Sequence, residues 1–149
     1  MNTGNRTTRA RNLLVAGFLI LLLGATSTAC QPGVLAARDL GLVNGARAAA
    51  GLPALRWDDN AAGKAQRWAQ HLADTNTLAH SRLTTEITGN WVILGENVGY
   101  AGSVEQVHDG FMNSPRHRGS ILNPRFSSAG VGVATRGNLV FVVEVFRGV

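Results

Sequence analysis

The C-terminal part of the chain contains the pattern that most restricts its fold. Residues 129–134 alternate Gly or Ala with Val, and residues 139–146 form a strongly β-branched segment. Arg136-Gly137-Asn138 lies between them and is typical of a turn, so the two segments predict an antiparallel hairpin. In the second strand one face would hold Val140, Val142 and Glu144, and the other Leu139, Phe141, Val143 and Val145.

Helical patterns precede this hairpin. Apolar spacing predicts helices over 34–50, 59–76 and 104–113, and a short helix from Pro115 through Leu122. Asp58 and Ser103 are suitable N-caps, and Gly51 is a suitable stop after the first helix. A short strand is expected within 91–98. Helices packed against a small antiparallel sheet make an α+β domain the predicted fold class.

Composition limits both size and function. The 149 residues are enough for one ordinary domain, and a hydrophobic fraction of 45% argues against general disorder. The net charge of +5 first suggests nucleic-acid binding, but Arg6, Arg9 and Arg11 account for three of these charges. From Cys30 onward, 11 Lys and Arg face nine acids, too small an excess for a surface that follows phosphates. We therefore expect no nucleic-acid partner.

The N-terminal residues predict export. Three arginines precede an uncharged run from Leu13 to Ala25, which at 13 residues is short for a membrane span and suits a signal peptide. Small residues before Cys30, the only cysteine, resemble a bacterial lipoprotein processing site. We therefore predict a signal peptide at 1–29, a single domain at 30–149, lipidation of Cys30, and location at the extracellular face of the cell membrane or secretion. The alternatives are an uncleaved membrane anchor, or ordinary cleavage near Ala29 that leaves Cys30 unmodified.

The four histidines differ in context. His71 is interpreted as a half-buried structural residue, and His108, three residues after Glu105, as part of a solvated helix face. His80 and His117 instead fall where regular structure ends, a common position for site residues. Glu96 follows Gly95 in an apolar strand and needs a partner if it is buried.

Six motifs occur in an order that resembles a known family. They are Asn44-x-x-Arg47, Leu55-x-Trp57, the segment ending at His80, Gly95-Glu96-Asn97, the run from Phe111 through Ser114-Pro115-x-His117-Arg118 to Leu122, and 131–134. Together they resemble the CAP superfamily, also called SCP or PR-1-like, in its short bacterial form, over roughly residues 36–146. The resemblance implies a three-layer α-β-α sandwich with a small central antiparallel sheet.

The resemblance also implies a cleft with two His and two Glu. His80, Glu96 and His117 match three of these positions, and Ser114 stands at the fourth, with Asn97 beside Glu96. Two imidazoles and a carboxylate can hold a divalent metal such as Zn²⁺, with Mg²⁺ as the other candidate, and loss of the second carboxylate predicts weak binding. Glu96 can equally fix a histidine tautomer, or the three residues can form a structural cluster. Arg116 and Arg118 would favour an anionic ligand if they faced the site.

Two functions follow. The first is a non-enzymatic envelope module that binds a small ligand, a lipid or a cell-wall component, because the sequence contains no activated nucleophile. The second is a metal-assisted hydrolase of peptide or peptidoglycan, with metal on His80 and His117 and water activated by Glu96. Binding of sterol or fatty acid is a further possibility that some relatives suggest.

The other polar and aromatic residues are expected to be structural. Asn44, Arg47 and Asn97 are expected to bind backbone carbonyls. Trp57, Trp68 and Trp91 are expected to pack in or around the core, with sugar stacking on Trp91 or Tyr100 a lesser alternative. The sequence defines no oligomeric state.

Overall fold

The computed structural model describes Met1 and residues 31–149, and the predicted signal peptide and Cys30 lie outside the described residues. The elements are helices α1 (Pro32–Ala49), α2 (Asp59–Thr75), α3 (Val104–Asn113) and α4 (Pro115–Ile121), and strands β1 (Arg56–Trp57), β2 (Ile93–Ala101), β3 (Ser128–Arg136) and β4 (Leu139–Gly148). The predicted helices and the hairpin are confirmed. None of the helices in the described part is long and apolar enough to cross a membrane.

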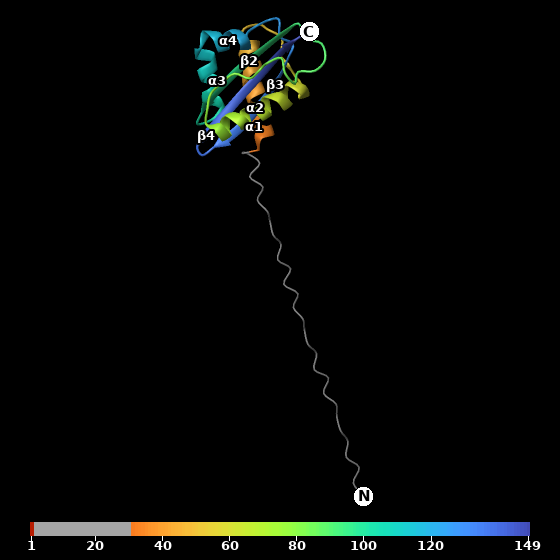
Figure 1. Cartoon of the computed structure of the whole chain (residues 1–149), viewed down its shortest axis with the longest axis vertical. Helices are drawn as coiled ribbons and strands as arrows, with labels where there is room; N and C mark the ends of the chain where they lie inside the picture. The colour runs from red at the N-terminus through yellow and green to blue at the C-terminus, as the bar shows by residue number, and fades with distance from the viewer. Residues whose placement is uncertain (2–30) are drawn as a thin grey trace.

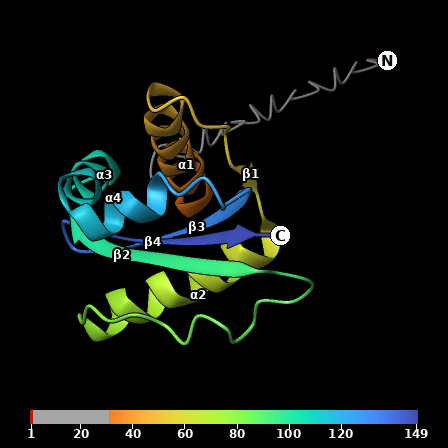
Figure 2. The same cartoon turned by 90° about the horizontal axis from the view of Figure 1, so that it is seen from above.

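The domain is a three-layer sandwich (Figures 1 and 2). Figure 2 shows α1, α3 and α4 on one face of the sheet and α2 on the other, with the long segment before β2 running beside α2. The strand order is β1-β3-β4-β2, so the hairpin strands are central and β2 lies at an edge. Helical layers thus cover both faces of the central strands, as expected for the three-layer α-β-α sandwich that the family resemblance implied.

The sheet is mixed, whereas the resemblance implied an antiparallel one. β3 and β4 pair antiparallel, from Arg136 opposite Leu139 at the turn to Ser128 opposite Arg147. β2 also pairs antiparallel with β4. The two-residue strand β1 pairs parallel with β3, with Arg56 opposite Ser128. A strand of two residues has no alternating pattern of its own, so periodicity does not predict it.

The two faces of the sheet hold different cores. Toward α1, α3 and α4, Val131, Val133, Val142 and Phe146 pack with Val43, Phe111 and Ile121. Toward α2, Phe141, Val143 and Val145 pack with Ala65, Ala69 and Leu72. This alternation confirms the predicted faces of β4 and places Glu144 in the first core.

Glycines in β3 allow α2 to approach the sheet closely. A Cβ at Gly130 would overlap the backbone of Ala61 and Ala62, and one at Gly132 would overlap the backbone of Ala65 and Gln66. The Gln66 side chain fixes this contact, because its amide donates to the Val133 carbonyl at 2.9 Å and accepts from the Val133 N–H at 3.0 Å. The Gly-rich strand therefore sets the spacing of two layers.

The predicted caps are present. The Asp58 carboxylate accepts from the Ala61 N–H at 3.0 Å at the start of α2, and Ser103 Oγ accepts from Gln106 N–H at 3.3 Å at the start of α3. Gly51 follows α1 with φ of 70°, the left-handed conformation that favours glycine after a helix.

Asp58 does more than cap α2, and this leads to a pH-dependent prediction. Its second carboxylate oxygen accepts from Arg147 at 3.1 Å and from Ser128 at 3.3 Å. Burial alone would raise the pKa of Asp58, but the Ala61 hydrogen bond and the Arg147 charge hold it below its usual value. The ionised form therefore stabilises the fold fully above the unfolded pKa of about 3.9, and this contribution is lost as the pH falls below that value.

We expect Asp58→Asn to lower the free energy of unfolding by about 1–2 kcal/mol at pH 7, because the amide still caps the helix but loses the charge-assisted bond. The difference from the wild type should shrink as the pH falls below about 4. Urea denaturation of both proteins from pH 7 to pH 3 measures this, with the exposed Asp74→Asn as control. A difference that stays constant over this range would contradict the ion-pair explanation.

Candidate functional site

Glu96 lies at the centre of the predicted site, on edge strand β2. Its Oε1 is 2.8 Å from Nδ1 of His80 and accepts from the Ser81 N–H at 2.9 Å, while its Oε2 accepts from Ser81 Oγ at 2.5 Å. The Glu96 side chain is only 3% exposed, whereas that of His80 is 49% exposed. The structure therefore brings the first two predicted residues into direct contact.

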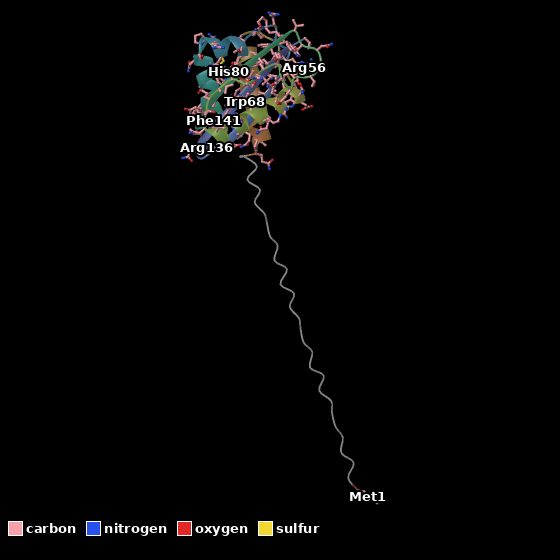
Figure 3. All side chains as sticks on the ribbon, in the orientation of Figure 1. Met1, Arg56, Trp68, His80, Arg136 and Phe141 are labelled. Atoms are coloured by element: carbon pink, nitrogen blue, oxygen red, sulfur yellow. The ribbon has the colours of Figure 1, made fainter. Side chains whose placement is uncertain are left out.

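The contact with Glu96 determines which ring nitrogen of His80 carries a proton. A carboxylate accepts hydrogen bonds, so Nδ1 of His80 carries the proton that points to Glu96. In the neutral ring the other nitrogen, Nε2, then holds a free lone pair. The segment that carries His80 is fastened to α2, because the Trp68 indole donates to the Ala79 carbonyl at 2.8 Å; Figure 3 labels Trp68 and His80. His80 is thus oriented from both sides with one nitrogen available.

His117 reaches the same region from α4. Its ring packs on Phe111 with the centroids 5.0 Å apart, and it is partly buried. Burial lowers the pKa of His117, and the nearby charges of His80 and Arg116 lower it further. His117 is therefore neutral at physiological pH and offers a second unprotonated ring nitrogen.

The predicted residues line two neighbouring hollows. His80 and Ser81 line one of about 470 Å³ with Lys64, Arg67, Trp68, Arg82, Thr85 and Glu86. His117 and Ser114 line another of about 380 Å³ with Leu78, Val98, Gly99, Tyr100, Val107, Gly110 and Phe111. The first hollow is basic and the second is mainly apolar, so the region can accept an amphipathic molecule.

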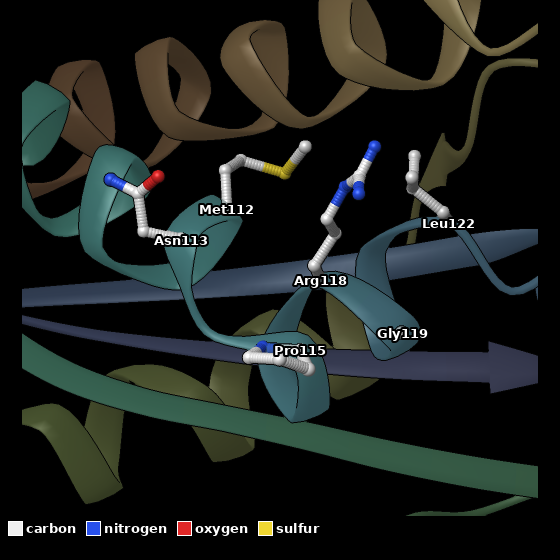
Figure 4. Close-up of a pocket in the computed structure, with 6 residues that line it drawn as sticks. All are labelled: Met112, Asn113, Pro115, Arg118, Gly119 and Leu122. Carbon is white, nitrogen blue, oxygen red and sulfur yellow. The ribbon is translucent and has the colours of Figure 1, made fainter.

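A third hollow of about 450 Å³ lies at the corner of α3 and α4 (Figure 4). It is lined by Met112, Asn113, Pro115, Arg118, Gly119 and Leu122, and in the figure Met112 and Arg118 point toward α1. Arg118 therefore does not line the hollow that contains His117, and of the two arginines only Arg116 acts on that histidine.

Three further predicted residues serve the framework. Asn44 donates to the Leu55 carbonyl at 3.1 Å and accepts from the Leu55 N–H at 2.8 Å. Arg47 is fully buried and donates to the carbonyls of Pro53, Ile121, Asn123 and Phe126. Asn97 donates to the His117 carbonyl at 3.1 Å, so it holds α4 against β2. These contacts agree with the predicted carbonyl binding and explain how the site keeps its shape.

The prediction for His108 was wrong. His108 is buried rather than solvated, and it lies with Asp39 and Glu144 in a cluster whose ligand atoms are all within 4.8 Å of one another. This cluster of Asp, His and Glu could hold a metal ion. Among the described residues, this cluster is the group whose ligand atoms all lie within 4.8 Å of one another. The ligand atoms of His80, Glu96 and His117 do not lie that close together. The sequence does contain one sign of this cluster, which is the acid Glu144 within the β-branched segment 139–146. It does not show that Asp39 and His108 lie next to Glu144, because that depends on how the helices pack on the sheet.

His71 also differs from its interpretation as a half-buried residue. It is exposed on α2 and its ring stacks on Trp68, with centroids 4.7 Å apart. Its surface position leaves it outside both the predicted site and the buried cluster.

The chain is therefore a helix–sheet–helix domain in which edge strand β2 presents the buried carboxylate of Glu96 to the exposed His80. A family model described as CAP, the cysteine-rich secretory protein family, matches residues 40–146. The chain therefore belongs to the CAP family. No curated protein sequence matches the chain.

Solved structures share this fold. An extracellular protein with an SCP domain from Bacillus anthracis has a TM-score of 0.71 at 26% identity, covering 79% of this chain and 41% of that one. An outer surface protein from Borrelia burgdorferi has a TM-score of 0.66 at 19% identity, covering 73% and 88%. A cysteine-rich secretory protein from Staphylococcus aureus has a TM-score of 0.65 at 22% identity, covering 80% and 40%. The chain thus spans about two fifths of the first and third of these proteins.

Proposed function

We propose that this chain is an exported CAP-domain protein of the bacterial envelope, whose cleft at His80, Glu96 and His117 binds a small ligand of lipid or cell-wall origin. Three relatives are described as extracellular, outer surface or secretory proteins, which supports export. The signal-peptide pattern at residues 1–29 supports it independently.

The burial of Glu96 against His80 and Ser81 is the observation that supports a binding function rather than a catalytic one. Both of its oxygens are engaged by His80 and Ser81, and its side chain is buried. A general base must have a lone pair within reach of the proton that it removes. The Glu96 side chain is 3% exposed and three hydrogen bonds hold it against His80 and Ser81, so water has little access to it and its role here is to orient His80.

The same arrangement supports weak metal binding in the cleft. Imidazole ligands suit Zn²⁺ better than Mg²⁺, which prefers oxygen ligands. With Glu96 buried against His80 and Ser81 and with Ser114 at the place of a second carboxylate, the two imidazoles are the accessible protein ligands, fewer than the three or four of stable zinc sites. Metal would therefore be an accessory to ligand binding.

Ligand binding can be tested with two probes, muropeptides released from cell wall and palmitate. We expect one of them to shift the imidazole resonances of His80 and His117 in NMR spectra. His80→Ala and His117→Ala should each weaken binding by about tenfold, since each removes a hydrogen-bonding ring. The exposed Arg125→Ala, outside both hollows, is the control and should bind as the wild type does. Equal binding by all four proteins would place the ligand elsewhere and reject the cleft.

The hydrolase alternative is tested on the wild type, His80→Ala and Glu96→Ala. Each is loaded with Zn²⁺ and incubated with cell wall and with peptide substrates. The binding proposal predicts no turnover. Turnover that is lost in both His80→Ala and Glu96→Ala would instead establish a metal-dependent hydrolase.

Membrane attachment through Cys30 is the second part of the proposal. Helix α1 begins at Pro32, two residues after Cys30, so a lipid there would hold this end of the domain at the membrane surface. Exposed Val34 and Trp57 lie near that end, and Trp57 shares an apolar hollow with Pro32 and Gly33. Such side chains suit contact with a bilayer surface.

We expect Cys30→Ala to move the protein from the membrane fraction to the soluble fraction after signal-peptide cleavage, because a diacyl anchor supplies most of the attachment. Fractionation with immunoblotting measures the change. Asp74→Asn, an exposed substitution on the domain itself, is the control and should remain with the membrane. Retention of Cys30→Ala in the membrane fraction would indicate that residues 13–25 stay as an anchor.

A further inference from the structure

The buried cluster of Asp39, His108 and Glu144 lies between the sheet and the helical layer, away from the cleft. Asp39 comes from α1, His108 from α3 and Glu144 from β4, so three segments distant in sequence meet there. Asp39 and Glu144 are fully buried and His108 is 8% exposed. A cluster at such a junction connects both helices to the central strand.

The cluster is short of hydrogen-bond donors. Within the described residues, both oxygens of Asp39, Oε1 of Glu144 and Nδ1 of His108 are buried without a hydrogen-bond partner. None of the ion pairs in that part of the chain includes Asp39 or Glu144. Buried lone pairs without partners cost free energy, and buried carboxylates without a cation cost more.

Other contacts hold the ligand atoms in place. Glu144 Oε2 accepts from Nδ2 of Asn97 at 2.8 Å, which leaves Oε1 free. The same Asn97 amide donates to the His117 carbonyl, so the cluster is linked to the α4 backbone. The pKa of Asp39 is raised to about 7: burial is the main cause, interaction with the Glu144 side chain lowers it, and the Glu105 charge raises it.

We propose that Asp39, His108 and Glu144 form a second, buried binding site for a divalent transition-metal ion, which joins α1 and α3 to β4. The mixed nitrogen and oxygen donors select Zn²⁺-like ions over Mg²⁺ and Ca²⁺. Two carboxylates neutralise the charge of such an ion. Ligands around zinc lie roughly 3.3 Å apart, so ligand atoms within 4.8 Å of one another close around an ion by small side-chain rotations.

The proposal is independent of ligand binding in the cleft and is tested with Zn²⁺ and Co²⁺ on the full chain carrying Cys30→Ala, in mild detergent, so that no thiolate contributes. We expect one equivalent of Zn²⁺ by native mass spectrometry and a rise in Tm of about 5 °C or more, reversed by a chelator. NMR should show Zn²⁺ shifting the imidazole nitrogens of His108, and Co²⁺ should give the visible absorption of a low-symmetry site.

Variants separate the two sites. Asp39→Asn and His108→Gln should each lose the Zn²⁺-dependent rise in Tm, and Asp39→Asn should leave the metal-free Tm equal or higher because it removes a buried charge. The double variant His80→Ala/His117→Ala, with a disrupted cleft, should keep the rise, as should His71→Gln.

Two results would overturn the proposal. One is a wild-type chain whose Tm and His108 resonances do not respond to Zn²⁺, which would mean that the carboxyls hold a proton only. The other is a rise that survives Asp39→Asn and His108→Gln but disappears when the cleft histidines are removed. If a variant fails to fold, the His108 resonances of the wild type still decide the question.

Discussion

Replacing Arg47 with Met is expected to lower the free energy of unfolding by about 4 kcal/mol. The buried guanidinium donates to four carbonyls at 2.8–3.3 Å, from the segment after α1 and from the end of α4 onward. Met fills much of the same volume but leaves these acceptors unpaired, and each buried unsatisfied group costs about 1–3 kcal/mol, with partial relief from water. Urea denaturation followed by circular dichroism measures the loss.

Arg125→Met is the matched control for this change. Arg125 is exposed, and we expect a difference within about 0.5 kcal/mol of the wild type. If Arg47→Met lowered the free energy of unfolding no more than Arg125→Met, the carbonyls of Pro53 and residues 121–126 would have to find other donors. Arg47 would then not be the residue that joins α1 to α4.

Replacing Gly132 with Ala is expected to cost about 3 kcal/mol although it adds a single methyl group. The new Cβ would overlap the backbone of α2 at Ala65 and Gln66, which cannot yield as a flexible side chain can. The helix would have to move off the sheet and lose the paired Gln66–Val133 hydrogen bonds. Thermal and urea unfolding measure the effect, and NMR should show shifts along α2.

Gly110→Ala provides the contrast. Gly110 lies in α3, and a Cβ there has no atom within 4 Å. Ala is the better helix former, so this variant should be unchanged or more stable by up to about 1 kcal/mol. A Gly132→Ala protein as stable as Gly110→Ala would show that α2 does not depend on the close approach.

The sequence predicted those parts of the site that depend on local pattern and on family resemblance. His80 and Glu96 were expected to meet, and they are 2.8 Å apart. Their role in binding stays a prediction. Ser81 was missed, although it donates two of the three hydrogen bonds that Glu96 accepts from this segment, because a serine in a loop has no pattern that distinguishes it.

His108 shows why the remainder was not predictable. Its spacing from Glu105 resembles a solvated pair, and an isolated helix gives no reason to turn that face inward. Burial arises because α1 and α3 both pack on β4, which places Asp39 and His108 over Glu144. Three segments that are each ordinary alone form an unusual site only when they are assembled.

The sequence by itself determined the helices, their caps, the hairpin and the family, because these depend on periodicity, capping side chains and turn residues within short windows. Only the tertiary structure decided that Gly132 lies against α2, that Glu96 is buried against His80 and Ser81, and that Asp39, His108 and Glu144 converge. Those facts depend on distances between segments up to about a hundred residues apart, which are set when layers pack and side chains lose contact with water.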